Sequence, residues 1–223
     1  MRAVALVIGI AVVAPPARAR ADGGGTIVGT VKVTRPAGAD AGPILVYVVG
    51  FTEPAPDAAA EIQQRDKHFI PDLVGVTAGQ TVAFPNSDPF LHNVFSPTEA
   101  RRFDLGSYPK GEVRKRKFPE LGAVDVYCNV HPEMSATIVV LPNRRHAIAK
   151  PDGSFAIDGI PPGKWTVFAY SRRAAKPASA KVEVGATGAA KVELALDEIQ
   201  REFKHENKFG EKYRAGDEYR PSH

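Results

Sequence analysis

Short strand-like segments run through most of the chain and are separated by turns rich in Gly, Pro, Asp and Asn. Some alternate between apolar and polar residues with a period of two, and others are compactly apolar, both of which are typical of β-strands. Val, Ile and Thr, which favour strands, are frequent in them. The segments are residues 26–33, 44–49, 74–84, 113–118, 124–128, 136–141, 155–157, 165–170, 181–184 and 191–196. The pattern predicts an all-β chain.

The segments differ in detail. Residues 74–84 have the pattern of strand, tight turn and strand, with Gly79 at a turn position that needs a positive φ. Residues 113–118 alternate with charged side chains, as an edge strand does. Residues 58–64 are expected to form a short helical turn or an irregular edge, and residues 197–204 a short helix that leads into an extended tail.

The N-terminus has the features of an export signal. Arg2 precedes an apolar run over residues 3–14, and Ala19-Arg20-Ala21 is a small-x-small cleavage site. The run is too short to span a bilayer comfortably, so we expect no stable membrane span after cleavage. An uncleaved membrane anchor is the alternative. Residues 1–21 are therefore predicted to be a signal peptide, and the mature protein to be periplasmic or secreted.

Charge and composition exclude several classes of protein. Removal of residues 1–21, which carry three arginines and no acid, lowers the formal net charge from +4 to +1. We therefore expect no nucleic-acid partner, and the basic residues 114–117 are more typical of a solvated loop or a partner patch. The 43% hydrophobic content argues against wholesale disorder. A single Cys excludes a disulfide scaffold and any zinc site with two thiolates.

Cys128, His131 and Met134 lie within seven residues, on one loop between two predicted strands, and His92 lies well upstream. Two imidazoles, one thiolate and a weak thioether are the ligand set of a blue-copper electron-transfer site. Zinc prefers four strong ligands, and iron–sulfur clusters need more cysteines. Taken singly, each residue is more often structural than functional. His68 is kept as a weak possibility, and the histidines at 146, 205 and 223 are expected to be exposed.

Residues from about 60 to 141 resemble the cupredoxin family of plastocyanin, azurin and amicyanin. The resemblance is carried by the spacing Cys-x2-His-x2-Met with Pro132 after the His, by residues 76–84, and by His92-Asn93-Val94. It implies an eight-stranded Greek-key sandwich with one type 1 copper ion. It also assigns the copper ligands, with Met134 axial and three residues trigonal: His92, Cys128 and His131.

The resemblance assigns supporting roles as well. The family residue that matches Asn93 ties the two ligand loops together by hydrogen bonds. Asn129 stands where the family usually has Ser or Thr, and an amide can preserve this clasp in altered form. Glu133 replaces an apolar residue and places a negative charge near His131, which we expect to affect partner choice and to lower the reduction potential.

The flanking segments, residues 22–57 and 142–196, resemble two parts of a carboxypeptidase-regulatory-like β-sandwich. The similar features are Gly29-Thr30-Val31 and the hairpin sequence of residues 152–165 with its Pro-Pro-Gly turn. Our hypothesis is that the copper domain, residues 58–141, is inserted into this smaller sandwich. The alternative is that residues 22–56 add strands to the cupredoxin. Residues 197–223 are expected to form a charged C-terminal tail.

Such combinations resemble exported bacterial proteins described as methylamine-utilisation-like or plastocyanin-like. The resemblance implies a copper protein that carries single electrons between periplasmic redox proteins, a dehydrogenase or a cytochrome. Two alternatives remain open: a copper-binding or copper-delivery protein, and an interaction module without metal. An enzyme is not expected, because coordination filled by protein leaves no open position for a substrate and a nearby Met adds nothing to a Cys128–His131 nucleophile.

Overall fold

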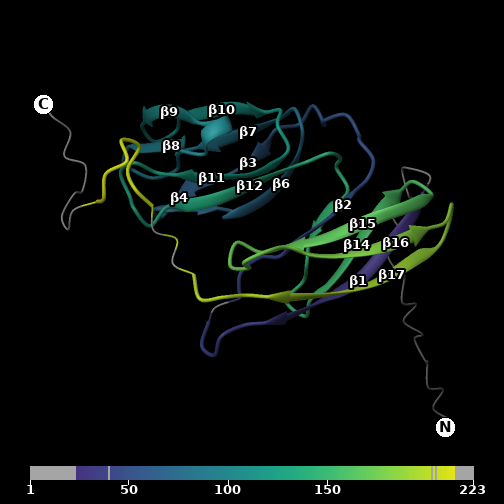
Figure 1. Ribbon diagram of the computed structural model, residues 1–223. Helices are drawn as coiled ribbons and strands as arrows, with labels where there is room; N and C mark the ends of the chain where they lie inside the picture. Colours follow the sequence, from purple (N-terminus) through teal and green to yellow (C-terminus); the bar gives the residue numbers. More distant parts are fainter. Residues whose placement is uncertain (1–23, 40, 202, 204, 214–223) are drawn as a thin grey trace, which may run out of the picture.

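A computed structural model describes residues 24–39, 41–201, 203 and 205–213. The described chain consists of β-strands arranged as two β-sandwiches (Figure 1). Its helical content is one 3-10 turn, η1 (Glu99–Arg101), so the all-β prediction is confirmed. Among these residues, no helix is long and apolar enough to cross a membrane. The expected signal peptide, residues 1–21, lies outside the described residues.

The first sandwich packs a five-stranded sheet, in the order β6-β12-β11-β8-β9, against a three-stranded sheet in the order β10-β7-β3. A short hairpin, β4-β5, lies beside them. The strands are β3 (Ala60–Glu61), β4 (Gln63–Arg65), β5 (His68–Ile70), β6 (Leu73–Thr77), β7 (Gln80–Pro85), β8 (His92–Ser96), β9 (Phe103–Tyr108), β10 (Val113–Phe118), β11 (Gly122–Tyr127) and β12 (Ser135–Leu141). A single apolar core that includes Phe84, Tyr108 and Cys128 fills the space between the sheets.

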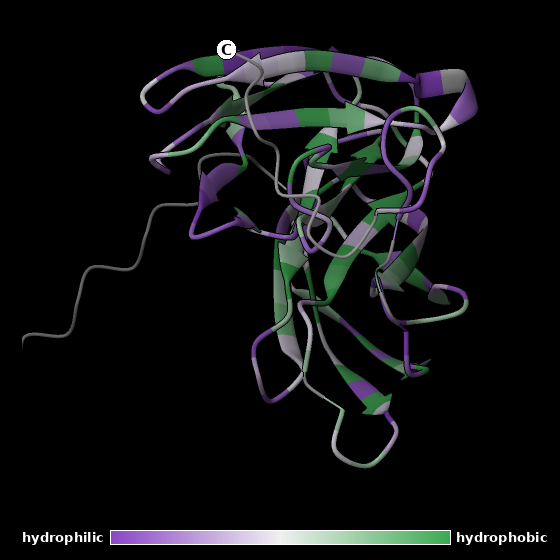
Figure 2. Cartoon of the chain, turned by 90° about the vertical axis from the view of Figure 1, so that its left-hand side faces the viewer, coloured by the Kyte–Doolittle hydropathy of each residue, from purple (hydrophilic) through white to green (hydrophobic). Residues whose placement is uncertain are grey.

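The second sandwich packs a four-stranded sheet, β13-β2-β15-β16, against a three-stranded sheet, β14-β1-β17. Its strands are β1 (Gly25–Thr34), β2 (Leu45–Val49), β13 (His146–Ile148), β14 (Ser154–Ile160), β15 (Gly163–Tyr170), β16 (Ala178–Val184) and β17 (Ala189–Asp197). In β17, buried Val192, Leu194 and Leu196 alternate with exposed residues. Figure 2 shows such alternation of hydrophobic and hydrophilic residues along the longer strands. This sandwich has its own apolar core.

The described part of the chain runs from the second sandwich into the first and then returns to the second. β1 lies between β14, to which it is antiparallel, and β17, to which it is parallel over nine residue pairs from Thr26 to Thr34. β2 lies between β13 and β15. The described pairings of β1 and β2 are thus all with strands that follow residue 145 and none is with the first sandwich.

The two sandwiches share a small apolar junction. Leu45 of β2 packs there with three residues of β6 and β12, namely Leu73, Val139 and Leu141. Arg172, which follows β15, donates to the Thr137 hydroxyl and pairs with Asp72 at 3.0 Å. The junction therefore combines apolar burial with a buried guanidinium that reaches from one sandwich into the other.

Several local predictions are tested directly. Gly79 has φ 90° and β10 lies at a sheet edge, as predicted. Residues 58–64 were expected to form a short helical turn or an irregular edge, but they contain β3 and the first two residues of β4. Gln64 accounts for part of this difference, because it is buried in β4 and donates to the Tyr108 hydroxyl. The first sandwich has ten strands where the resemblance implies eight, and three of them have only two or three residues.

The prediction of a short helix over residues 197–204 is wrong for the residues described there. β17 continues to Asp197, and Glu198 then bridges to Ala174. The buried Glu198 carboxylate accepts hydrogen bonds from Arg35 and from the Ser171 hydroxyl, so this segment is held extended by tertiary contacts that outweigh its helix propensity.

Candidate metal centre

The predicted ligands come from two neighbouring strands at one end of the first sandwich. His92 is the first residue of β8, and Cys128 follows the last residue of β11, where Tyr127 pairs with Phe95 of β8. His131 and Met134 lie on the loop that joins β11 to β12. Two backbone hydrogen bonds close this loop, from the Met134 amide to the His131 carbonyl (3.1 Å) and from the Cys128 amide to the Met134 carbonyl (3.3 Å).

Three possible ligand atoms converge. The Nδ1 atoms of His92 and His131 lie 3.1 Å apart, and the Cys128 Sγ atom lies 3.8 Å from each of them. All three residues are buried. The structure therefore brings together a His-Cys-His cluster from residues that are up to 39 positions apart in sequence.

The dimensions of this triangle suit a metal ion. A point equidistant from the three atoms lies about 2.1 Å from each of them, as follows from the three separations, against ~2.0 Å for metal–imidazole and ~2.3 Å for metal–thiolate bonds. The donor set, two imidazoles and a thiolate, is the trigonal set of blue-copper sites. The residues present thus fit such an ion.

Asp88 fixes the orientation of His92. Its Oδ2 atom lies 2.7 Å from His92 Nε2, so Nε2 carries the proton and Nδ1 is left free to bind a metal. The same carboxylate accepts hydrogen bonds from the backbone amides of Asp66 and Lys67. Burial alone would raise the pKa of Asp88, but hydrogen bonds from Lys67, His92 and Asp66 outweigh it and hold that pKa below its usual range.

Cys128 is held in an apolar setting. Its side chain is buried in the core, and the Val130 amide donates to Sγ at 3.4 Å. Burial raises the pKa of the Cys128 thiol, although backbone hydrogen bonds from Asn93, Val130 and His131 act in the opposite direction. A thiolate in this setting is stabilised when a cation binds beside it.

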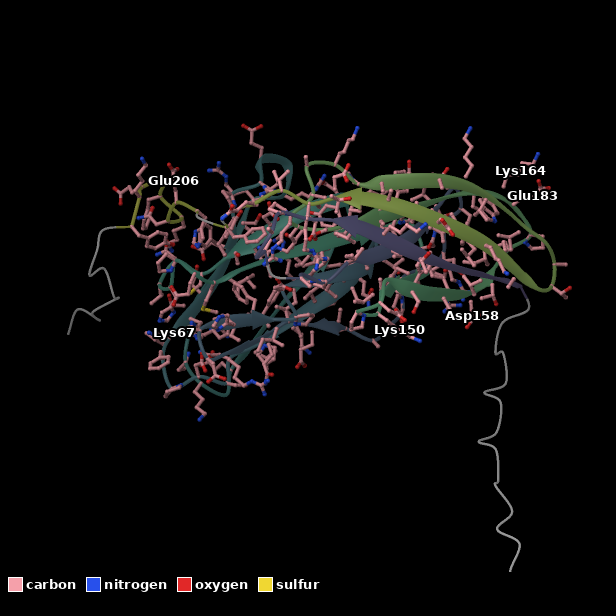
Figure 3. All side chains as sticks on the ribbon, turned by 90° about the horizontal axis from the view of Figure 1, so that it is seen from below. Lys67, Lys150, Asp158, Lys164, Glu183 and Glu206 are labelled. Carbon is pink, nitrogen blue, oxygen red and sulfur yellow. The ribbon has the colours of Figure 1, made fainter. Side chains whose placement is uncertain are left out.

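His131 lies closer to the surface than His92. It is 7% exposed where His92 is 0% exposed, and its neighbours Pro132 and Glu133 are exposed. The Phe90 ring, 45% exposed, lies 6.1 Å from the His131 ring, and the Lys67 ammonium lies over Phe90. Figure 3 shows Lys67 at the end of the molecule opposite Lys164 and Glu183. Burial, followed by the nearby His92, lowers the pKa of His131.

Met134 is fully buried in the same core as Cys128. Its backbone closes the ligand loop through the two hydrogen bonds given above. Its role as the axial ligand stays a prediction.

The two supporting asparagines have partners that the resemblance did not imply. The Asn93 side chain donates to Asp104 Oδ1 on β9 at 2.6 Å, and the Asn129 side chain accepts from the Lys208 amide at 2.7 Å. Among the described hydrogen bonds, none joins these two side chains directly. The longer reach of the Asn129 amide suits a partner outside the ligand loops.

The remaining described histidines differ in their exposure to solvent. His68 is exposed and lies outside the cluster, with Nδ1 2.6 Å from the Asp66 carbonyl. The expectation that His146 and His205 are exposed is wrong: both are partly buried, and burial lowers the pKa of each. His223 lies outside the described residues.

Sequence reasoning missed Asp88 and the C-terminal contacts. An acid four residues before a candidate ligand was a signal for Asp88, since metal-binding histidines usually donate their second N–H to a carboxylate or carbonyl. No comparable signal marks the contacts of residues 205–213, because they depend on how the chain returns from the second sandwich.

No protein-family model matches the chain, and no curated protein matches it. Among solved structures, the chain is similar to a mutant of amicyanin in the Cu(I) form, with 20% identity and a TM-score of 0.36, over 43% of this chain and 97% of that chain. It is also similar to a purple cupredoxin from Nitrosopumilus maritimus, with 22% identity and a TM-score of 0.34, over 36% of this chain and 98% of that chain. At this similarity, the interpretation of the site rests on its own geometry.

Proposed function

We propose that the cluster binds one copper ion as a type 1 centre and that the protein carries single electrons between redox partners. His92, Cys128 and His131 would be the trigonal ligands and Met134 the axial one. The observation that supports this most strongly is the convergence of the two Nδ1 atoms and the Cys128 Sγ atom.

Copper in such a site supplies a one-electron couple between Cu(II) and Cu(I). The chain's own residues would keep the ligand atoms in place in both states. Asp88 holds the His92 ring, the Val130 amide donates to the Cys128 sulfur, and backbone hydrogen bonds close the loop. A site organised in this way needs little rearrangement when its charge changes, which favours rapid electron exchange.

The exposed edge of His131 is the proposed docking region. Phe90 and Pro132 offer apolar surface there, and Lys67 and Glu133 add charges of both signs. We propose that the partners are periplasmic redox proteins, a dehydrogenase or a cytochrome, and that residues 1–21 direct export. We further propose that residues 22–57 and 142–196 form a separate domain into which the copper domain is inserted.

Copper titration of the mature protein tests the proposal. The wild type is expected to develop intense blue absorption and a narrow-hyperfine EPR signal at one equivalent of Cu(II), because the Cys128 thiolate couples strongly to copper. Cys128→Ser should give neither signal. His68→Ala is the matched control, since His68 is exposed and lies outside the cluster, and it should behave as wild type. Identical colourless spectra for wild type and Cys128→Ser would refute the proposal.

Copper exchange separates electron transfer from copper delivery. Reversible one-electron redox with slow copper loss to a chelator is expected for an electron carrier, because four protein ligands favour retention. Rapid loss from both oxidation states would instead favour delivery. A fold without metal would give no change in spectrum with copper.

A further inference from the structure

The segment after β17 returns to the first sandwich and lies against the ligand loop. Figure 1 shows this yellow segment running from the end of β17 to the end of the sandwich near β8 and β9. We call its described residues 205–213 the C-terminal strap. Figure 3 places Glu206 of this strap at the same end of the molecule as Lys67.

The strap contacts the ligand loop at two consecutive residues. The Tyr213 hydroxyl donates to the Cys128 carbonyl at 3.0 Å, and the Lys208 amide donates to Asn129 Oδ1 at 2.7 Å. The His205 ring stacks on Tyr127, the residue before Cys128, with ring centroids 4.3 Å apart and planes inclined by 27°. The strap therefore contacts three consecutive residues, 127, 128 and 129.

The strap also reaches the segment that carries His92. The Lys208 ammonium pairs with Asp104 Oδ2 at 2.7 Å, and Asp104 Oδ1 accepts from the Asn93 side chain at 2.6 Å. Asn93 is adjacent to His92. Lys208 thus connects both ligand segments: its backbone holds Asn129, and its side chain reaches Asn93 through one carboxylate.

The strap is organised by its own hydrogen bonds. Asn207 Oδ1 accepts from the amides of Phe209 and Glu211, and the Asn207 amide donates to the Glu211 carbonyl at 2.8 Å. Gly210, with φ 81°, closes this turn. A turn with internal bonds of this kind presents Lys208 and Tyr213 in a defined geometry, which lowers the entropy cost of their contacts.

We propose that the C-terminal strap is a clasp that holds the Cys128 loop to the His92 segment, with Lys208 and Tyr213 as positioning residues. It would reinforce the hydrogen bond from the Asn93 backbone to the Cys128 sulfur, because the Asn93 and Asn129 side chains do not bond to each other here. For its effect on copper this rests on the proposed function, whereas the clasp itself is a property of the polypeptide.

Hydrogen exchange in the metal-free protein tests the clasp without copper. In the double variant Lys208→Met, Tyr213→Phe, amides of residues 128–131, 133 and 134 should exchange about ten-fold faster than in wild type, as expected for the loss of one partly exposed ion pair and one neutral hydrogen bond. Amides of β17 serve as an internal reference and should not change. Lys212→Met is the matched control, because Lys212 is an exposed strap lysine, and Lys208→Arg should retain the Asp104 pair and restore protection.

The same variants are then loaded with copper. Loss of copper to a chelator should be about ten-fold faster in the double variant than in Lys212→Met, and the EPR hyperfine splitting should shift, because the Cys128 loop is less constrained. Exchange and copper loss equal to those of Lys212→Met would overturn the clasp. If the wild type binds no copper, the proposed function fails, and the exchange experiment still decides on the clasp.

Discussion

The two sandwiches have the same architecture but bury different side chains. The core of the second is apolar, and β17 shows the simple alternation of buried and exposed residues that a two-layer fold requires. The first buries, close to its ligand end, a set of polar side chains: Gln64, Asn86, Asp88, His92 and Asn93. Burial of polar groups costs free energy unless they are hydrogen-bonded, so the sandwiches differ in what their buried polar groups do: those of the first lie beside the proposed metal ligands.

Three of these buried polar residues, Asn86, Asp88 and His92, are connected by hydrogen bonds. The Asn86 side chain donates to the carbonyls of Phe90 and Tyr108, and its oxygen accepts from the Asp88 amide. Asp88 in turn holds His92. The set therefore fixes the loop that precedes β8 and, through it, one ligand of the proposed copper site. The second sandwich also buries hydrogen-bonded polar side chains, such as Asn143 and Glu198, but none of the described hydrogen bonds joins these two to the His-Cys-His cluster.

Core truncations should separate the two sandwiches most strongly. Phe84→Ala in the first core and Leu194→Ala in the second should each lower the free energy of unfolding, by ~3–5 and ~2–5 kcal/mol, through lost burial and a new cavity. Only Phe84→Ala should also weaken copper binding. The measurements are chemical denaturation followed by circular dichroism and copper titration in native buffer.

Equal loss of copper affinity in both variants would contradict the expectation that only the core of the first sandwich supports copper binding. It would mean that the junction at Leu45, Leu73, Val139 and Leu141 couples the two sandwiches into one cooperative unit.

The strand positions were largely predictable because each strand carries its signal locally. β10 alternates charged residues as an edge strand does, and the pattern of residues 74–84 predicted the turn at Gly79 that separates β6 from β7. Part of the His-Cys-His cluster was predictable for a similar reason, since Cys128 and His131 lie close in sequence, whereas His92 lies 36 residues before Cys128 and was assigned through the family resemblance. The residues 58–64 were predicted less well, because β3 and β4 are too short for a pattern and depend on tertiary partners such as Tyr108.

Contacts between distant parts of the chain could not be predicted from local patterns. The charged composition of residues 197–223 indicated an extended tail, yet Lys208 contacts Asn129, 79 residues earlier, and Tyr213 contacts Cys128, 85 residues earlier. Charged and polar residues usually remain in solvent, so only the three-dimensional path of the chain shows that these contact a ligand loop. Asn129 was singled out, but its partner was not.

Removal of the Asp88 charge should affect the first sandwich in a smaller and more specific way. Asp88→Asn retains the size of the side chain but weakens its hold on the protonated His92 Nε2, and we expect copper affinity to fall ~10–100-fold. Competition with a chelator of known affinity measures this loss. The control is Asp57→Asn, an exposed acid, which should retain wild-type affinity. Unchanged affinity in Asp88→Asn would show that the backbone alone orients His92.

The smallest expected effect lies at the junction and depends on pH. His146 opens β13, pairs with Tyr47 of β2, and lies so close to β6 that a Cβ atom at Gly75 would be 2.9 Å from its ring. Burial lowers the pKa of His146 in the folded protein. As pH falls below ~6.5, the unfolded chain takes up a proton that the folded chain resists, so stability is present above that pH and is lost below it.

His146→Gln should remove this share of the pH dependence. Between pH 7 and 5, the wild type should lose stability relative to His146→Gln with a slope of at most about 1.4 kcal/mol per pH unit, the limit for one proton. His131 and His205, whose pKa values are also lowered, contribute equally to both proteins and cancel in the difference. The exposed His68→Gln is the control, and a parallel pH profile for wild type and His146→Gln would show that the junction accepts the charged ring without cost.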